Sequence, residues 1–394
     1  MSLKIVANAS EILTPDDLIR DGAVVFDERI IEVGKSSLIE RYDGAEVIDA
    51  RGKTVIPGFI DSHTHLVFAG SREKELSMKL EGRSYLEIAK AGYGMGSTIR
   101  ATREASKEEI NSQSILRLNE MVRHGTTTAE AKNGYGLDLE NELKLLWTIE
   151  DLNKRGPIDV LPTFLAHAIP NGKDRGEYVN EVVDMLPKVR GRAKFVDVFC
   201  EEGFFSIDES RRILERAREL GFGLKMHADE FNDLGGAELA AELGCISADH
   251  LIRSGDSGLR ALVGGGVVPC LLPANSFSSF DLYADARKMI SMGLPVALAS
   301  DLNPNCYLTN MQFVIQLACY HMRMTPQEAI RGATLNGARA LGIEEEVGSL
   351  EKGKKADMLI LDCKSHLDLA YRFGVNLVST VIKGGETISD RKDR

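Results

Sequence analysis

The most informative stretch of the chain is the segment 55–65, which reads Val55-Ile56-Pro57-Gly58-Phe59-Ile60-Asp61-Ser62-His63-Thr64-His65. Its apolar part predicts a buried strand that ends in two histidines. Because side chains two residues apart on a strand share a face, the imidazoles of His63 and His65 point the same way. Such a pair can bind one cation, although a lone His-x-His is equally compatible with a half-exposed strand.

Similar apolar runs recur along the chain and alternate with amphipathic helical stretches. Strands are predicted at 58–65, 125–131, 159–167, 194–200, 221–227, 246–250, 266–272 and 295–301. Helices are predicted at 107–124, 139–155, 178–190, 208–220, 234–243 and 257–263. A further helix at 326–341 would begin with a capping box formed by Thr325 and Glu328. Eight βα units over roughly 250 residues favour a closed (β/α)₈ TIM barrel of the α/β class.

The two ends of the chain are different in character, because short strand-like runs occur there without helices between them. These runs are 3–6, 22–26 and 29–33 before the barrel, and 358–361 and 377–382 after it. We therefore expect a small β-sandwich domain formed by residues 1–57 plus 345–394, and a barrel formed by residues 58–344.

Composition excludes several classes of function. The 394 residues carry a formal charge of −11 and no long basic run, so nucleic acid is not an expected partner. No segment of about 18 apolar residues is present, so no membrane span is predicted. Residues 1–7 lack the apolar block of an export signal, and we expect a cytoplasmic location. The six cysteines form no Cys-x-x-Cys pair and are expected to be reduced.

Histidines gather at the predicted strand ends. Of the eight histidines in the chain, five lie at the ends of predicted strands: His63, His65, His167, His227 and His250. Asp301 ends the last predicted strand, 295–301. In a barrel these ends meet at one rim, where catalytic groups lie. A set of three imidazoles and one carboxylate suits Zn²⁺ or Fe²⁺ better than Ca²⁺ or Mg²⁺. We predict a divalent metal site made by His63, His65, His227 and Asp301.

Two further residues are candidates for proton transfer. Glu230 follows His227 by three residues and could protonate a leaving nitrogen. Its neighbour Asp229 is expected to be a solvated loop carboxylate. His250 could hydrogen-bond the attacking hydroxide or the oxyanion, with a packed histidine inside the barrel as the alternative.

Several ordered motifs resemble the amidohydrolase superfamily over almost the whole chain. They are the segment 55–65, His227-Ala228-Asp229-Glu230, Asp249-His250, Ser300-Asp301 and the segment 348–357. Four blocks, 67–73, 132–136, 165–168 and 301–304, are similar to the imidazolonepropionase family. That family hydrolyses 4-imidazolone-5-propanoate to N-formimidoyl-L-glutamate in histidine degradation.

The resemblance implies roles for individual residues. Metal ligands fall on the same four residues, and one ion is expected because the fourth strand lacks the terminal lysine with which binuclear relatives bridge two metals. The catalytic residues would be Glu230, His250 and Asp301. Substrate contacts fall on Arg72, Tyr85, Tyr135, His167, Glu230, Asn303, Asn305 and Cys306. Arg72 suits a propionate carboxylate, because a guanidinium can bind it through two parallel hydrogen bonds.

The chain departs from the family pattern at Asn305-Cys306, where relatives generally have Gly followed by Ser or Thr. We expect this loop to keep its shape with altered hydrogen bonding, since Asn also adopts positive φ and Cys is sterically similar to a small hydroxyl residue. The resemblance further implies a small-molecule substrate and a homo-oligomer, a dimer.

Two other functions remain open from the sequence. A deaminase of a nucleobase-like ring would use a similar set of residues around one metal, but it would release ammonia and would have no use for Arg72. A non-catalytic scaffold related to amidohydrolases would usually have lost metal positions, whereas all four are present here.

Overall fold

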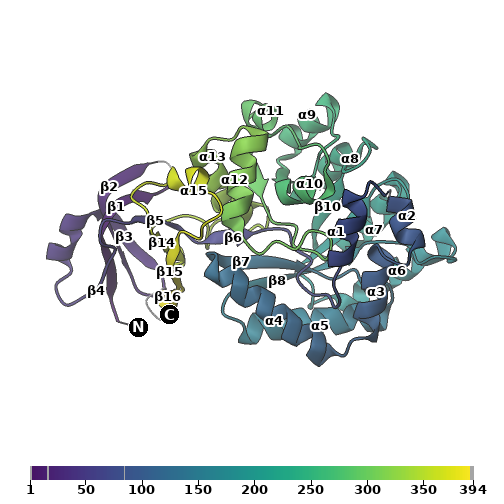
Figure 1. Cartoon of the computed structure of the whole chain (residues 1–394), viewed down its shortest axis with the longest axis horizontal. Helices are drawn as coiled ribbons and strands as arrows, with labels where there is room; N and C mark the ends of the chain where they lie inside the picture. Colours follow the sequence, from purple (N-terminus) through teal and green to yellow (C-terminus); the bar gives the residue numbers. More distant parts are fainter. Residues whose placement is uncertain (1, 16, 84, 391–394) are drawn as a thin grey trace.

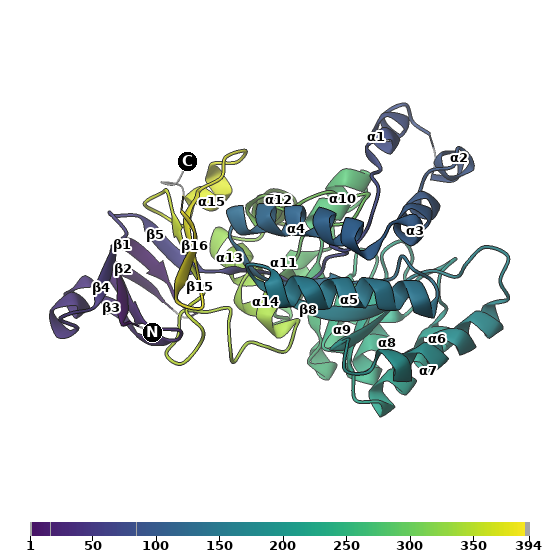
Figure 2. The same ribbon diagram turned by 90° about the horizontal axis from the view of Figure 1, so that it is seen from below.

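The structure, a computed structural model, describes residues 2–15, 17–83 and 85–390; of the side chains of Tyr85, Leu86 and Ala89 nothing is described. The chain forms a barrel surrounded by helices and a smaller sheet beside it (Figures 1 and 2). Strands from both ends of the chain, purple and yellow in Figure 1, make the smaller sheet together. This arrangement confirms the predicted fold class.

Eight strands of the described chain form the barrel sheet, in the order in which they occur and with every neighbouring pair parallel. They are β6 (Phe59–Asp61), β7 (Thr126–Lys132), β8 (Asp159–Ala166), β9 (Phe195–Cys200), β10 (Gly223–Ala228), β11 (Ser247–His250), β12 (Val268–Leu271) and β13 (Ala297–Leu298). Each overlaps one of the eight predicted strands, which are thereby confirmed.

The barrel closes just beyond the carboxyl ends of its first and last strands. The backbone N–H of Asp301 donates to the carbonyl of His63 at 3.1 Å, and that of His65 donates to Leu302 at 2.8 Å. These bonds hold the segment after β6 against the segment after β13. Three of the four predicted metal ligands therefore lie at the closure itself.

Helices cover the outside of the barrel (Figure 2). The six predicted crossover helices are confirmed as α4 (Lys107–Arg123), α5 (Leu139–Arg155), α6 (Arg175–Val189), α7 (Ile207–Glu219), α8 (Gly236–Leu243) and α9 (Asp256–Gly265). Further helices are α1 (Glu73–Leu80), α2 (Tyr85–Lys90), α3 (Met95–Glu104), α10 (Pro273–Ser279), α11 (Ala286–Ser291), α12 (Met311–Met322) and α15 (Asp368–Tyr371), with a 3₁₀ helix at Ser36–Arg41. Among the helices of the described ranges, none has the length and apolar character needed to span a bilayer.

The helix predicted at 326–341 is wrong in one respect, because it is two helices, α13 (Pro326–Gly332) and α14 (Leu335–Arg339). The predicted capping box of Thr325 and Glu328 is present. The break falls at Thr334, whose φ of −131° and ψ of −94° are not helical. It lets α14 pack closely on the barrel, where a Cβ on Gly337 would come within 2.9 Å of the carbonyl oxygen of Ile60.

The smaller sheet is mixed and has β1 at its centre. Its strands are β1 (Lys4–Leu13), β2 (Leu18–Phe26), β3 (Ile30–Lys35), β4 (Glu46–Asp49), β5 (Thr54–Pro57), β14 (Met358–Leu361), β15 (Val378–Lys383) and β16 (Glu386–Asp390). The first half of β1 pairs with β4 and its second half pairs with β5, so the sheet divides at this strand. β5 pairs antiparallel with β14, with Pro57 opposite Met358.

The apolar run 55–60 therefore serves both sheets. β5 belongs to the small sheet and β6 to the barrel, with Gly58 between them. The predicted strand 58–65 is accordingly longer than β6, and the two histidines that follow Asp61 lie in the closing segment.

Gly125 lies where the two sheets meet, immediately before β7. Its φ is +99°, and an added Cβ would come within 2.7 Å of Leu359, 3.0 Å of Phe59 and 3.0 Å of Val378. These neighbours belong to β14, β6 and β15. The position thus requires both a left-handed backbone and the absence of a side chain.

We predict that Gly125→Ala destabilises the protein far more than Gly44→Ala, a matched control with φ +89° and no atom within 4 Å of the added Cβ. The control should lose only the left-handed strain, about 1–2 kcal/mol. Gly125→Ala should lose about 1–3 kcal/mol more through overpacking. Urea unfolding of both variants measures the difference, and equal losses would contradict the prediction.

Candidate metal centre and active site

The barrel rim brings the four predicted metal ligands together. His63 and His65 follow β6, His227 lies on β10, and Asp301 follows β13. Nε2 of His63 and Nε2 of His65 each lie 3.6 Å from Oδ1 of Asp301. The ring centroids of His63 and His227 are 4.5 Å apart. All four side chains are buried.

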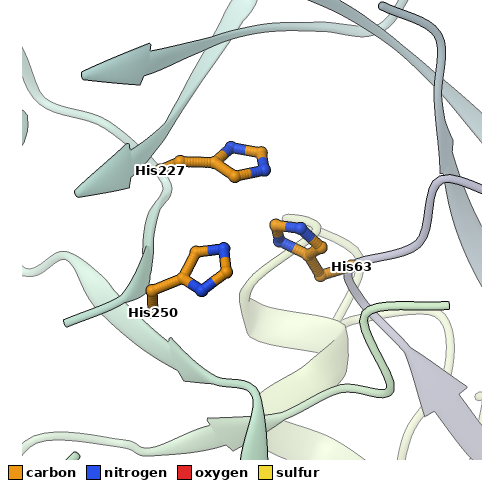
Figure 3. A group of neighbouring side chains, drawn as sticks. All are labelled: His63, His227 and His250. Atoms are coloured by element: carbon orange, nitrogen blue, oxygen red, sulfur yellow. The ribbon is translucent and has the colours of Figure 1, made fainter. Parts of the chain in front are cut away.

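His250, at the end of β11, belongs to the same cluster. In Figure 3 its ring and those of His63 and His227 face one another across one space. One ring nitrogen from each of these three histidines lies within 4.8 Å of the other two. The ligand atoms of His63, His65 and Asp301 form a second group with the same spacing. The two groups share His63. His250 is therefore close enough to be a ligand, a role that the sequence did not predict.

Buried carboxylates orient two of the rings. Asp249 Oδ2 lies 2.6 Å from Nδ1 of His63, and Asp197 Oδ2 lies 3.0 Å from Nδ1 of His227. A carboxylate on Nδ1 fixes the proton there and leaves Nε2 with a free lone pair. Nε2 of both rings is buried and has no hydrogen-bond partner among the described residues.

The protonation state of the cluster suits a divalent metal. Burial lowers the pKa of His63, His65 and His227 well below the usual range, so these imidazoles are neutral, as ligands must be. Burial raises the pKa of Asp301 to about 7, and a cation beside Oδ1 would lower it again. Oδ1 of Asp301 is also buried without a described partner. Nitrogen and carboxylate donors in these proportions fit zinc or iron.

A layer of buried charges lies directly beneath the cluster. We call it the buried charge layer; it consists of Glu130, Lys132, Asp197, Lys225 and Asp249, each with 0% of its surface exposed. Nζ of Lys132 lies 2.7 Å from Asp197, 2.9 Å from Glu130 and 3.6 Å from Asp249. Burial opposes a charged lysine, but the three carboxylates outweigh it and hold the pKa of Lys132 above its ordinary value.

Sequence reasoning missed this layer, although a signal for it exists. Lys225 precedes His227 by two residues on β10, so the two side chains point into the same interior. Charged residues inside otherwise apolar barrel strands, such as Asp197 in Phe-Val-Asp-Val-Phe, are the sign of such a layer.

Glu230 lies beside the cluster, and its surroundings favour the protonated acid. The side chain is 8% exposed, and Oε1 lies 3.6 Å from Nδ1 of His250. Burial, and after it the charge of Asp301, raise the pKa of Glu230 well above the usual range. The carboxylate of Glu201 accepts the backbone N–H groups of Phe231 and Asn232 and thereby fixes the loop after Glu230.

Several residues of the rim have left-handed backbones, which are unfavourable for residues other than glycine. They include Asp229 at φ 52°, His250 at φ 75° and Asp301 at φ 50°.

The expectation that Asp229 is solvated is wrong. Its side chain is buried and accepts from the backbone N–H groups of Gly236 and Ala237, where α8 begins.

Two of the predicted substrate contacts line the other side of the cluster. The ring of His167 stacks on His65 with centroids 5.1 Å apart, and the ring of Tyr135 lies 5.1 Å from His167. Burial lowers the pKa of His167 to about 4, so its imidazole is neutral. Neutral His167 can offer a hydrogen bond to a ring or carbonyl without adding charge.

Arg72 lies near enough to Tyr135 and His167 for its charge to influence the pKa of both, but it already has a partner. Its Nε and Nη2 donate to the two oxygens of Glu75 at 2.8 and 2.7 Å, in the two-pronged geometry expected for a substrate carboxylate. Glu75 is buried, and its Oε1 also accepts the N–H of Gly94. No pattern in the sequence predicted a role for Glu75. The side chain of Tyr85 lies outside the described residues, so its predicted contact is not described.

The loop after Asp301 uses its polar side chains internally. Oδ1 of Asn303 accepts the N–H groups of Asn305 and Cys306 at 2.7 and 3.0 Å. Oδ1 of Asn305 accepts from Lys79 of α1 at 2.6 Å. Cys306 is 3% exposed and packs in a small apolar cluster. In this structure the three residues stabilise the loop and attach it to α1.

An open hollow of about 850 Å³ lies next to the rim. Leu137 and Ala168, which follow Tyr135 and His167 closely in sequence, form part of its wall. Arg100, Arg103 and Lys173 also line it together with Asp138, which pairs with Arg103 at 2.6 Å, so its wall has a net positive charge although the chain as a whole is acidic. An anion would be attracted to this side of the molecule.

Comparison with known proteins places these features in a family. Two models described as amidohydrolase family match residues 46–84 and 208–388. An imidazolonepropionase of Geobacillus kaustophilus is 49% identical, and the match covers 94% of this chain and 91% of that protein. An imidazolonepropionase of Alkaliphilus oremlandii is 47% identical, with 95% and 92% covered.

Solved structures share the fold at much lower identity. A 5-methylcytosine deaminase from Klebsiella pneumoniae superposes with a TM-score of 0.76 at 18% identity, covering 98% of this chain and 97% of that one. An adenosine deaminase from Xanthomonas campestris with bound zinc gives 0.74 at 16% identity, covering 98% and 93%. These likenesses concern the fold alone.

The buried charge layer generates a prediction. Lys132→Met should destabilise the protein by about 3–5 kcal/mol, because carboxylates remain buried without their cation. Zinc affinity should fall by roughly 10–100-fold, since Asp197 and Asp249 lose the group that holds them against the histidines. Urea unfolding and zinc titration measure the two effects.

The control is Lys194→Met, which removes an exposed lysine whose Nζ donates to the carbonyl of Leu341 at 3.1 Å. It should lose little stability and keep its zinc affinity. If Lys132→Met behaves like this control, the buried charge layer does not support the site.

Proposed function

The chain belongs to the imidazolonepropionase family of the amidohydrolases, and from this we propose that it hydrolyses 4-imidazolone-5-propanoate to N-formimidoyl-L-glutamate in histidine degradation. It is a hydrolase that opens a cyclic amide at a C–N bond. The observation that best supports the assignment of residues is the convergence of unpartnered Nε2 atoms of His63 and His227 and Oδ1 of Asp301 beside the buried Glu230.

We propose one divalent ion per chain, zinc or iron, held by His63, His65, His227 and Asp301. Support comes from their neutral rings, from the carboxylates on Nδ1 of His63 and His227 that leave Nε2 of both rings free, and from Nε2 of His63 and His65 lying 3.6 Å from Oδ1 of Asp301. A divalent ion held there would supply Lewis-acid polarisation of the ring carbonyl and would lower the pKa of a bound water from roughly 15.7 towards about 7. The buried charge layer supports a cation above it, because three carboxylates exceed two lysines.

Proton transfer can be assigned to three side chains. Water attacks the ring carbonyl carbon, and its proton is accepted by Asp301 or by His250, whose pKa burial lowers to about 4. As the new C–O bond forms, the ring C–N bond breaks and the nitrogen needs a proton. Glu230, whose pKa burial raises well above its usual range, donates it. The product keeps both nitrogens, so no ammonia is released.

Substrate binding requires recognition of a carboxylate and a flat polar ring. We propose that His167 and Tyr135 contact the ring side, in line with their position against His65. Arg72 would bind the propionate carboxylate, which must displace Glu75 or share the guanidinium with it. The basic hollow is the proposed approach for this anionic substrate. Contacts from Tyr85, Asn303, Asn305 and Cys306 stay predictions.

We further propose that the chain forms a homodimer, as predicted. Exposed aromatic side chains are present away from the rim: Tyr320 is 60% and Phe373 64% exposed, and their rings pack edge to face at 5.8 Å. Burying them against a second copy would be favourable. The cytoplasmic location stays a prediction.

The proposed function is tested by identifying the product. Purified enzyme loaded with zinc or iron should convert 4-imidazolone-5-propanoate to N-formimidoyl-L-glutamate, followed by mass spectrometry, without releasing ammonia. Release of ammonia from aminated nucleobase rings at a higher rate would favour the deaminase instead. A folded chain that binds no metal and lacks both activities would favour the scaffold.

We predict that Glu230→Gln keeps its metal, near one ion per chain, while turnover falls by roughly 100-fold or more, because the amide cannot deliver a proton. Steady-state kinetics and elemental analysis measure the two quantities. Glu202→Gln, which changes an exposed glutamate of a neighbouring loop, is the control and should leave turnover unaltered. Retained turnover in Glu230→Gln would remove Glu230 from the mechanism.

A further inference from the structure

Asn275, on α10 just after β12, is a polar residue that touches two members of the site. Its Nδ2 lies 2.5 Å from Oδ2 of Asp301 and 3.3 Å from Oε1 of Glu230. Glu230 follows β10 and Asp301 follows β13, so one amide connects two strand ends that are far apart in the sequence.

The direction of this amide is fixed by its other end. The hydroxyl of Ser279, four residues later on α10, lies 3.1 Å from Oδ1 of Asn275. The ionised carboxylate of Asp301 only accepts hydrogen bonds, and an amide nitrogen only donates them. Placing Nδ2 toward the carboxylates and Oδ1 toward the hydroxyl satisfies all three contacts, whereas the flipped amide would oppose oxygen to oxygen.

For Asp301 the contact separates the roles of its two oxygens. Oδ2 is bound by Asn275, whereas Oδ1 lies 3.6 Å from Nε2 of both His63 and His65. A carboxylate that is free to rotate could exchange these oxygens or turn away from the histidines. Asn275 holds one orientation, the one that presents Oδ1 to the histidines.

Glu230 accepts a hydrogen bond from the same amide nitrogen of Asn275 that donates to Asp301. Burial and the charge of Asp301 disfavour ionised Glu230, and the bond from Asn275 partly offsets this effect. A donor placed between two buried carboxyl groups also limits how they move relative to each other. The amide thereby sets the distance between the proposed proton donor and the proposed ligand.

We propose that Asn275 is a positioning residue for the reaction, which holds Asp301 with Oδ1 toward the histidines and keeps Glu230 beside it. The expected effects on kcat and KM rest on the proposed function, whereas the expected effect on metal binding is independent of it. Asn275 acts through Asp301 and Glu230 and is assigned no contact with the substrate.

The test compares Asn275→Ala and Asn275→Asp with Ser278→Ala. The control removes one side-chain hydrogen bond of the same helix, from Ser278 Oγ to the backbone oxygen of Asn275 at 3.1 Å, and leaves the amide in place. Zinc affinity is measured by competition with a chromophoric chelator, kcat and KM by steady-state kinetics, and Tm by thermal unfolding.

Asn275→Ala should weaken zinc binding by about 10–100-fold and lower kcat by a similar factor, with KM changed by less than about threefold. Asn275→Asp should be more impaired than Asn275→Ala, because it adds a third carboxyl group instead of a donor. The control should stay within about twofold of the native protein in zinc affinity and kcat, and all variants should unfold at nearly the native Tm.

Two results would overturn the proposal. One is an Asn275→Ala variant with native zinc affinity and native kcat. The other is a loss that appears in Tm alone, since a purely structural role would move stability and leave zinc affinity unchanged. If the native protein does not hydrolyse the imidazolone, the proposed function fails, yet the zinc measurements still decide whether Asn275 positions Asp301.

Discussion

The ion pairs between Lys132 and the carboxylates of Asp197 and Asp249 are the interaction on which the site depends. These carboxylates bind Nδ1 of His227 and His63, and that bond turns Nε2 of each ring into the rim. Without a buried cation the carboxylates would tend to take up protons, and the ring orientation would be lost. The charge beneath the cluster therefore controls the geometry above it.

The backbone segments that close the barrel also contain three of the proposed metal ligands, His63, His65 and Asp301. Hydrogen bonds from Asp301 to His63 and from His65 to Leu302 join the first strand to the last, so the cluster is complete only when the barrel is closed. Local strain accompanies this arrangement, since His250 and Asp301 adopt left-handed backbones. Strain of this kind persists where the surrounding structure holds it in place, as the closed barrel does here.

The sequence predicted features that depend on local pattern. The eight strands, the six crossover helices and the capping box at Thr325 follow from periodicity and spacing, and His63, His65 and His227 could be grouped because strand ends share a rim. It could not predict features that depend on packing across the barrel. The break at Thr334, the burial of Asp229, the pairing of Arg72 with Glu75 and the place of Asn275 all arise from contacts between distant segments.

The pairing of β5 with β14 has a consequence for how the protein is made. When β5 leaves the ribosome, the edge of β5 that pairs with β14 has no partner, because β14 has not yet been translated. At about 5–20 residues per second, the roughly 300 residues that separate Pro57 from Met358 take about 15–60 s to synthesise. During that interval the nascent amino-terminal strands present an open edge, which makes them a natural target for chaperones and for misassembly between neighbouring nascent chains.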